Sequence, residues 1–171
     1  MQNIKTITAE QYICSMMPPQ KLTPKQALPK LMQYCAYQER CHKEVQDKLY
    51  AYGVFGIDAD EIISNLIQNN YLNEERFAIQ FAGGRFRIKQ WGKVKITYEL
   101  KKKQVSAYCI KKALKEINET DYQQTFYTLA DKKTAALKTE KNIFTKRKKL
   151  RDFLMQKGYE SQLIQAAINN C

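Results

Sequence analysis

The stretch Ile96–Gln104, which reads ITYELKKKQ, places two apolar residues four positions apart and a candidate helix-ending residue four positions further on. The same spacing recurs in Val45–Gly53, VQDKLYAYG, and in Leu150–Gly158, LRDFLMQKG. Apolar residues four apart share one face of a helix, and glycine most easily adopts the left-handed conformation that follows a helix end. Gln104 is a weaker substitute for glycine at that position. The three stretches therefore predict three copies of one helical unit, with anchor leucines 51 and 54 residues apart.

A longer helix is expected before each anchor stretch, and a shorter amphipathic helix after it. The preceding helices are expected at about residues 27–38, 73–89 and 121–138. The following helices carry apolar pairs on one face: Ile62 with Leu66, Ile110 with Leu114, and Ile164 with Ile168. This pattern predicts an all-α protein, built as an elongated or curved array of three tandem three-helix modules. A single compact helical bundle is the alternative.

The expected boundaries follow from the repeat and from the prolines. We expect a flexible N-terminal tail over residues 1–23, a first module over 24–70, a second over 71–119 and a third over 120–171. Thr23 followed by Pro24 is typical of a helix N-cap with proline in the first turn. Pro29 then has to lie in the first turn of the next helix or kink it.

The stretch Tyr71–Ala78, YLNEERFA, places two acids beside a strongly basic run. Asn73 is a good N-cap, and Glu74 and Glu75 then fall in the first turn, where negative charge complements the helix dipole. Catalytic acids are the alternative, but no histidine, metal set or nucleophile accompanies them. The stretch is therefore interpreted as a helix-initiating junction between the first and second modules.

The charge of the chain is concentrated in its C-terminal half. The net charge is +12, yet residues 1–80 carry 8 Lys and Arg against 9 Asp and Glu, whereas residues 81–171 carry 21 against 8. A cation excess of this size indicates an anionic partner. The partner is expected to meet the second and third modules.

Two basic clusters occupy equivalent places in the second and third modules. In the second, Ile96 and Leu100 face the core, so Tyr98 lies on the opposite, lysine-rich face, which suits a surface that grips a phosphate backbone and stacks bases. A solvated helix whose Tyr98 touches a neighbouring module is the alternative. The candidate binding residues are Arg85, Arg87, Lys89, Lys93, Lys95, Tyr98, Lys102, Lys146, Arg147, Lys148 and Arg151. The six cations of the second module are expected to be largely exposed, with Lys146, Arg147 and Lys148 on a related face.

Other classes of site find little support. Five scattered cysteines without a CxxC motif argue against a disulfide framework, and Cys35, Cys41 and His42 lack the further ligands of a zinc site. With one histidine and no cofactor motif, neither an enzyme nor a cofactor is expected. No apolar run approaches the roughly 20 residues of a membrane helix, and the N-terminus makes a poor signal peptide. A soluble, cytoplasmic, monomeric protein without a metal or membrane partner is expected.

The second module has a junction, YLNEERFA, followed by a basic stretch that ends in glycine and by an Ile-x-x-Glu-Leu helix. This order of features resembles the second module of the RecX family of bacterial RecA regulators. The matching residues are Tyr71, Leu72, Phe77, Ala78, Arg85, Gly92, Ile96, Glu99 and Leu100. The first module resembles the family pattern R-x-S-x-x-E-L-x-x-K-L-x-x-x-G through Arg40, Glu44, Val45, Lys48, Leu49 and Gly53, with His42 at the usual serine. The resemblance covers roughly residues 25–170.

The sequence departs from the family pattern in three places. Asn70 and Gln104 stand where the family has glycine, and Gly83 and Gly84 fall inside an expected helix. Two glycines in a helix cost roughly 1–2 kcal/mol of helix propensity, so a local bend or close packing is expected there.

The resemblance implies a protein that binds the RecA–DNA filament along its groove and restrains recombinase and coprotease activity. Some relatives are positive modulators, so the sign of the effect is open. A helical protein that binds single- or double-stranded DNA, or RNA, without a recombinase partner is the first alternative. A helical protein–protein adaptor whose charge serves solubility is the second.

Overall fold

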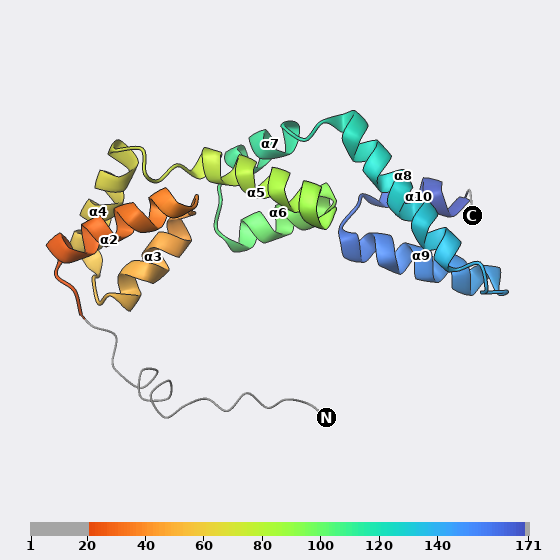
Figure 1. The fold of residues 1–171 in the computed structure, drawn as a ribbon, viewed down its shortest axis with the longest axis horizontal. Coiled ribbons are helices and arrows are strands. Elements are labelled where there is room, and N and C mark those ends of the chain that lie inside the picture. The colour runs from red at the N-terminus through yellow and green to blue at the C-terminus, as the bar shows by residue number, and fades with distance from the viewer. Residues whose placement is uncertain (1–20, 170–171) are drawn as a thin grey trace, which may run out of the picture. The chain divides into compact units, whose positions relative to one another are not determined.

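The structure is a computed structural model, and it describes residues 21–169. Most of the tail expected over residues 1–23 lies outside the described residues. The described part of the chain contains nine helices and no strand (Figure 1). The helices are α2 (Pro24–Tyr37), α3 (His42–Ala51), α4 (Gly56–Gln68), α5 (Glu74–Lys89), α6 (Lys93–Lys102), α7 (Ala107–Lys115), α8 (Glu119–Ala136), α9 (Ile143–Lys157) and α10 (Ser161–Asn169). The predicted all-α fold of three tandem three-helix modules is confirmed.

The described residues divide into two compact units. Unit 1 comprises residues 21–38 and 44–72, and unit 2 comprises residues 39–43 and 73–169. The core of unit 1 is formed by one face of each of its helices. Its buried residues are Ala27, Leu31, Cys35, Val45, Leu49, Val54, Ala59, Ile62, Leu66 and Leu72.

Unit 2 has one continuous apolar core, to which all six helices α5–α10 contribute. The anchors Leu100 and Leu154 are fully buried, as is Leu49 in unit 1. Phe126 and Tyr122 of α8 are the largest fully buried side chains, and their rings pack against Tyr159 at centroid distances of 5.0 and 5.3 Å. The second and third modules therefore share a core.

The residues predicted to end the anchor helices adopt the left-handed conformation. The φ angles are 75° at Gly53, 59° at Gln104 and 85° at Gly158, so the equivalence of the three positions is confirmed. Asn70, which replaces another family glycine, also has a positive φ of 58°. A left-handed φ strains most residues other than glycine, but asparagine adopts it more readily than most. Asparagine can therefore replace glycine at this position.

Two helices continue through residues that disfavour helix. Helix α2 is N-capped by Thr23 and begins at Pro24, as these two residues predicted, although its apolar pattern had placed it at about residues 27–38; Pro29 lies inside it, beyond the first turn. Gly83 and Gly84 lie inside α5. A local bend or close packing was expected at these glycines. A Cβ at Gly84 would meet nothing within 4 Å, so close packing is excluded there, whereas the nearest atoms to a Cβ at Gly83 belong to the Arg87 guanidinium. A bend at Gly84 stays a prediction.

Candidate nucleic-acid interface

Trp91, in the turn between α5 and α6, joins two of the predicted binding residues. The guanidinium carbon of Arg85 lies 5.2 Å from the Trp91 ring centroid, and the ammonium nitrogen of Lys95 lies 4.7 Å from it. Arg85 also lies 5.0 Å from the Phe81 ring. Both cations are half-buried. An aromatic face attracts cations at these distances, so the ring fixes their positions within unit 2.

The start of α6 is joined to the end of α9 by backbone hydrogen bonds. The Gly92 N–H donates to the carbonyl of Lys157 at 2.9 Å, and the Val94 N–H donates to the carbonyl of Gly158 at 3.1 Å. The first N–H groups and the last carbonyls of a helix have no partner within it, so the two helix ends satisfy each other. Lys95 adds a side-chain bond of 3.0 Å to the carbonyl of Gln156.

Glycine is required at this contact for steric reasons. A Cβ at Gly92 would overlap the carbonyl group of Gly158, and a Cβ at Gly158 would overlap Lys95. The glycine that ends the basic stretch therefore allows two backbones to touch. We call this contact, with its hydrogen bonds, the α6–α9 junction.

Lys93, the first residue of α6, belongs to the same junction. Its ammonium group forms an ion pair of 2.6 Å with Glu119 and lies 4.4 Å from the Tyr122 ring centroid. Its backbone N–H donates to the Tyr122 hydroxyl at 2.9 Å, and that hydroxyl donates to Glu160 at 2.6 Å. The hydrogen bond from Lys93 lowers the pKa of Glu119. Burial, followed by the hydrogen bond to Glu160, raises the pKa of Tyr122.

The prediction that the α5–α6 cations are largely exposed is therefore wrong for three of them. All three are half-buried: Arg85 packs on Trp91, Lys93 pairs with Glu119, and Lys95 donates to the Gln156 carbonyl. Lys93 and Lys95 are partly covered because the start of α6 packs against the end of α9, and Arg85 is partly covered because it packs on the Phe81 and Trp91 rings. Their predicted role in binding is not tested by this placement.

The other predicted residues of the second module face solvent. Arg87, Lys89 and Lys102 are exposed, and none of them forms an ion pair with a described residue. The Tyr98 side chain is 60% exposed, with the Lys102 ammonium 5.6 Å from its ring centroid. Tyr98 thus lies on the face opposite to the core, as the helical period predicted, and presents a stacking ring beside a cation.

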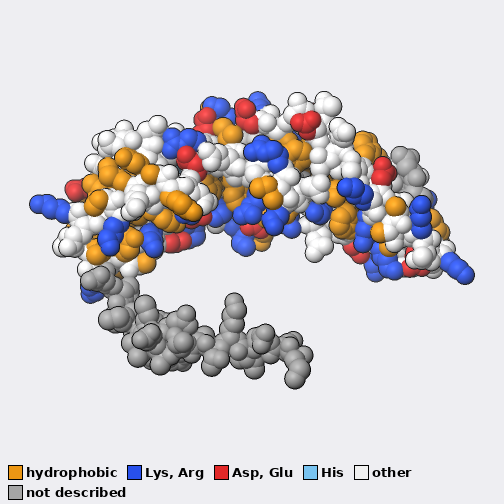
Figure 2. Space-filling view, viewed as in Figure 1, with side chains coloured by type: hydrophobic (Ala, Val, Ile, Leu, Met, Phe, Trp, Pro, Cys, Tyr) orange, Lys and Arg blue, Asp and Glu red, His pale blue; other side chains and the backbone are white. Residues whose placement is uncertain are grey.

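The α9 cluster is mixed in exposure. Lys148 and Arg151 are exposed, whereas Lys146 and Arg147 are half-buried. The adjacent Lys149 forms an ion pair of 2.7 Å with Glu140, and this bond lowers the pKa of Glu140. Figure 2 shows Lys and Arg side chains gathered over α6 and over α9 in the same view of unit 2. That both clusters serve one binding surface stays a prediction.

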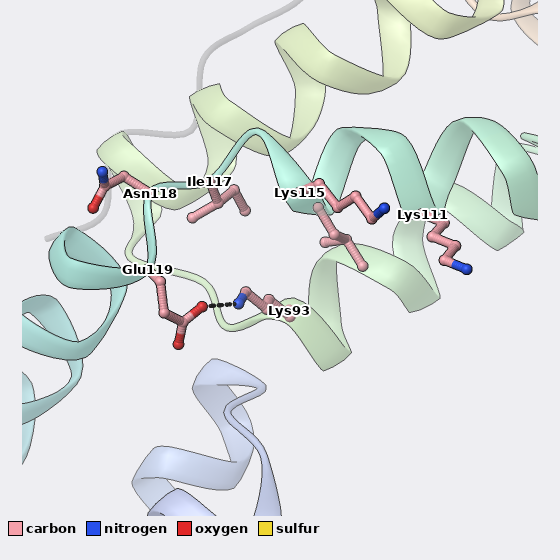
Figure 3. A pocket seen from close by; sticks show the side chains of 7 residues that line it. Lys93, Lys111, Lys115, Ile117, Asn118 and Glu119 are labelled. Carbon is pink, nitrogen blue, oxygen red and sulfur yellow. Dashed lines mark hydrogen bonds and ion pairs between the residues drawn. The ribbon is translucent and has the colours of Figure 1, made fainter.

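A cationic pocket between α6, α7 and the start of α8 was not predicted. It has a volume of 590 Å³ and is lined by Lys93, Lys111, Leu114, Lys115, Ile117, Asn118 and Glu119. Figure 3 shows Lys93 turned toward Glu119, while Lys111 and Lys115 project from α7 without turning to that pair. The i, i+4 spacing of Lys111 and Lys115 is visible in the sequence. Their proximity to Lys93 depends on how α7 leads into α8, which the pattern does not specify.

The acids at the start of α5 hold unit 2 together. The Asn73 side chain accepts the Arg76 N–H at 2.9 Å, which confirms the predicted N-cap. Glu74 accepts the Ser106 hydroxyl at 2.7 Å, and Glu75 forms an ion pair of 2.7 Å with Lys112 of α7. Burial alone would raise the pKa of Glu74, but the hydrogen bonds from Ser106 and Cys109, together with the nearby His42, outweigh it, so the pKa is lowered. The acids therefore do more than complement the dipole, because they join α5 to α7.

Residues 21–169 contain neither a metal-binding cluster nor a helix that could span a membrane. No group of three or more His, Cys, Asp or Glu side chains in this range is placed to hold a metal ion. None of the helices in this range combines the length and the apolar character needed to cross a bilayer.

Comparison with known proteins identifies the family. The model of the second three-helix domain of RecX matches residues 73–114, and the model of the third three-helix domain matches residues 119–168. Together the two matches cover more than half of the chain. The chain belongs to the RecX family. The resemblance found in the sequence is thus confirmed, and the matched ranges cover α5–α7 and α8–α10 apart from the last residue of α7 and of α10.

Similar proteins share the family name. A regulatory protein RecX of Prosthecochloris aestuarii is 29% identical over 145 residues, which are 85% of this chain and 93% of that protein. One of Bacillus cytotoxicus is 29% identical over 136 residues, 79% of this chain and 50% of that protein. One of Clostridium botulinum is 32% identical, over 75% of this chain and 60% of that protein. The chain thus spans about half the length of its Bacillus relatives.

Two solved structures have the same fold. The crystal structure of RecX from Lactobacillus salivarius superposes with a TM-score of 0.76 at 24% identity, covering 86% of this chain and 95% of that one. A second crystal structure of a regulatory protein RecX gives a TM-score of 0.73 at 17% identity, covering 96% and 79%. At 24% and 17% identity, these two superpositions show a shared fold and nothing more.

Proposed function

We propose that this RecX-family chain is a negative modulator of a RecA-type recombinase in the cytoplasm. In this proposal it binds the RecA–DNA filament along its groove as a monomer and restrains recombinase and coprotease activity. The observation that carries the proposal is the exposed face of α6, where Tyr98 and Lys102 stand together in a chain whose family is that of regulatory proteins. Stacking rings beside cations suit a nucleic-acid backbone.

The predicted binding residues differ in exposure and in whether they already have a counter-ion. Lys102, Arg87 and Lys89 are exposed and form no ion pair with any residue that the structure describes, so they are available to phosphates. Lys148 and Arg151 of α9 supply a second exposed set. Lys93 already has Glu119 as its counter-ion, so its contribution to binding would require exchange of a carboxylate for a phosphate.

The test compares retention of the full chain on RecA-coated and on bare single-stranded DNA, together with inhibition of RecA-promoted strand exchange. Preferential retention on the coated DNA with inhibition of exchange supports the proposal. Equal retention on both supports a DNA- or RNA-binding protein without a recombinase partner. Retention on neither supports a protein–protein adaptor.

A matched pair of variants tests the surface itself. Lys102→Ala should weaken inhibition without changing the unfolding temperature, because its side chain forms no ion pair among the described residues. Lys138→Ala, another exposed lysine of unit 2 outside the predicted clusters, should leave inhibition unchanged. Equal effects of the two substitutions would show that net charge, rather than this surface, governs binding.

A further inference from the structure

Unit 1 has an open groove with a composition unlike the rest of its surface. The groove has a volume of 500 Å³ and is lined by Lys30, Gln33, Tyr34, Tyr37, Lys48 and Tyr52. No acidic residue lines it. Unit 1 as described carries four Lys against five Asp and Glu. The unit as a whole is therefore not basic, and the lack of acidic residues is a property of the groove itself. Figure 2 shows Lys and Arg side chains beside hydrophobic ones, a class that includes Tyr, over α2 and α3.

The aromatic rings and cations of the groove are held in place by helix geometry. Tyr34 follows Lys30 by one turn of α2, and Tyr37 follows Tyr34 by three residues, so these side chains lie along one face. From α3, the Lys48 ammonium lies 5.8 Å from the Tyr34 ring centroid and 5.2 Å from that of Tyr52. The Lys48 ammonium therefore lies within cation–π distance of two of the rings that line the groove.

Tyr37 differs from the other two tyrosines because it is 86% exposed. A tyrosine this exposed contributes little to the core of unit 1, and its ring is open to a planar partner. The acids of the neighbouring helix, Glu44 and Asp47, precede Lys48 on α3 but do not line the groove. The site therefore offers one open aromatic face, two ammonium groups and the Gln33 amide.

We propose that this groove binds a single-stranded nucleic acid, with one base stacked on Tyr37 and the adjoining phosphates held by Lys30 and Lys48. Aromatic faces interleaved with cations are the means by which proteins hold single strands without sequence preference. The volume is that of a pocket for a small molecule, so it admits a nucleotide splayed from a strand, whereas the bases of a duplex are stacked and inaccessible. The site is in unit 1 and is separate from the proposed α6 and α9 surface.

The experiment measures base stacking apart from charge. Binding of the full chain to a fluorescent thymidine oligonucleotide is compared, by anisotropy, with binding to an abasic oligonucleotide of equal length. Tyr37→Ala should weaken binding of the thymidine strand by about 5- to 150-fold, which is the range for losing one base–aromatic stack. It should leave the affinity for the abasic strand within about twofold, because the phosphates are unchanged.

Three control variants complete the design. Tyr37→Phe retains the ring and should bind both strands as the unsubstituted chain does. Tyr50→Ala removes a tyrosine of α3 that is 50% exposed and outside the groove, and it should also leave both affinities unchanged. Lys30→Ala should weaken both strands and reduce the slope of log K against log[salt] by about 0.7, the value for one phosphate contact on a single strand.

The proposal is overturned if Tyr37→Ala binds the thymidine strand normally, or if it loses affinity equally for both strands. It is also overturned if the unsubstituted chain binds neither strand. The outcome is independent of the filament proposal, because Lys102→Ala tests the α6 surface in the other unit. If Lys102→Ala inhibits the filament normally and Tyr37→Ala gives the expected result, the proposal for the α6 surface is rejected and the proposal for the groove is retained.

Discussion

Replacing Gly92 by alanine should uncouple the α6–α9 junction. The backbone at Gly92 has φ −75° and ψ 162°, an extended conformation that alanine adopts without strain. The cost therefore comes from the added Cβ, which would overlap the Gly158 carbonyl group. To remove this overlap the two helix ends must separate, and the bonds from Gly92 to Lys157 and from Val94 to Gly158 lengthen or break.

The magnitude follows from those two bonds. Each backbone hydrogen bond contributes about 1 kcal/mol net, and leaving buried groups unsatisfied costs up to about 3 kcal/mol. We therefore expect Gly92→Ala to lower the free energy of unfolding by about 2–4 kcal/mol. For a chain of this length, each kcal/mol lowers the unfolding temperature by about 2–4 °C, which gives a decrease of about 4–16 °C.

The assay is urea denaturation followed by circular dichroism, with amide hydrogen exchange at Val94 as the local measurement. Gly84→Ala is the control, because a Cβ there meets nothing within 4 Å and alanine favours helix over glycine by about 1 kcal/mol. The control should be as stable as the original chain or slightly more so. Unchanged stability of Gly92→Ala, with normal protection of the Val94 amide, would refute the close backbone contact as a source of stability.

Three other substitutions test neighbouring parts of unit 2. Tyr122→Phe removes the hydroxyl that accepts the Lys93 N–H and should cost about 1–3 kcal/mol in thermal unfolding; unchanged stability would contradict a structural role for that bond. Glu74 has a lowered pKa in the folded chain. Its contribution to the free energy of unfolding is therefore complete above its ordinary pKa of 4.5 and is lost as the pH falls through the folded pKa. Glu74→Gln, which cannot titrate, should destabilise the chain at pH 7 but flatten the loss of stability on acidification, whereas parallel pH profiles would contradict the bond to Ser106. Lys102→Ala should reduce the salt slope of single-strand binding by about 0.7, and an unchanged slope would exclude a phosphate contact there.

The helical repeat could be predicted because its determinants are local. Leu100 and its counterparts are fixed by a spacing of four residues and by the residue that ends the helix, and both are visible in a window of ten residues. Even Gln104, an unfavourable residue for the position, adopts the left-handed conformation that the repeat requires. The N-cap at Asn73 was predictable for the same reason, since capping depends on the next three residues.

The roles of Lys93 and Lys95 could not be predicted, because their partners are distant in sequence. Lys95 binds the carbonyl of Gln156, 61 residues later, and Lys93 binds Glu119, 26 residues later. A helical wheel places both lysines on polar positions of α6 but gives no information about what lies opposite. Only the packing of one helix end on another shows that these cations are partly neutralised within the protein.

The two basic clusters, equivalent in the repeat, differ in how the protein compensates their charge. Cations in the first turn of a helix oppose its dipole. In α6 this cost is offset, because Lys93 is paired with Glu119 and Lys95 donates to the carbonyl of Gln156 near the end of α9. Most of the α9 cluster lies beyond the first turn of that helix, and Lys149 is paired with Glu140. Lys146, Lys148 and Arg151 form no ion pair with a described residue, so these three cations have no counter-ion among the residues that the structure describes. If a phosphate backbone is the partner, substitutions at Lys148 and Arg151 should weaken its binding without loss of stability, whereas substitutions at Lys93 should affect both.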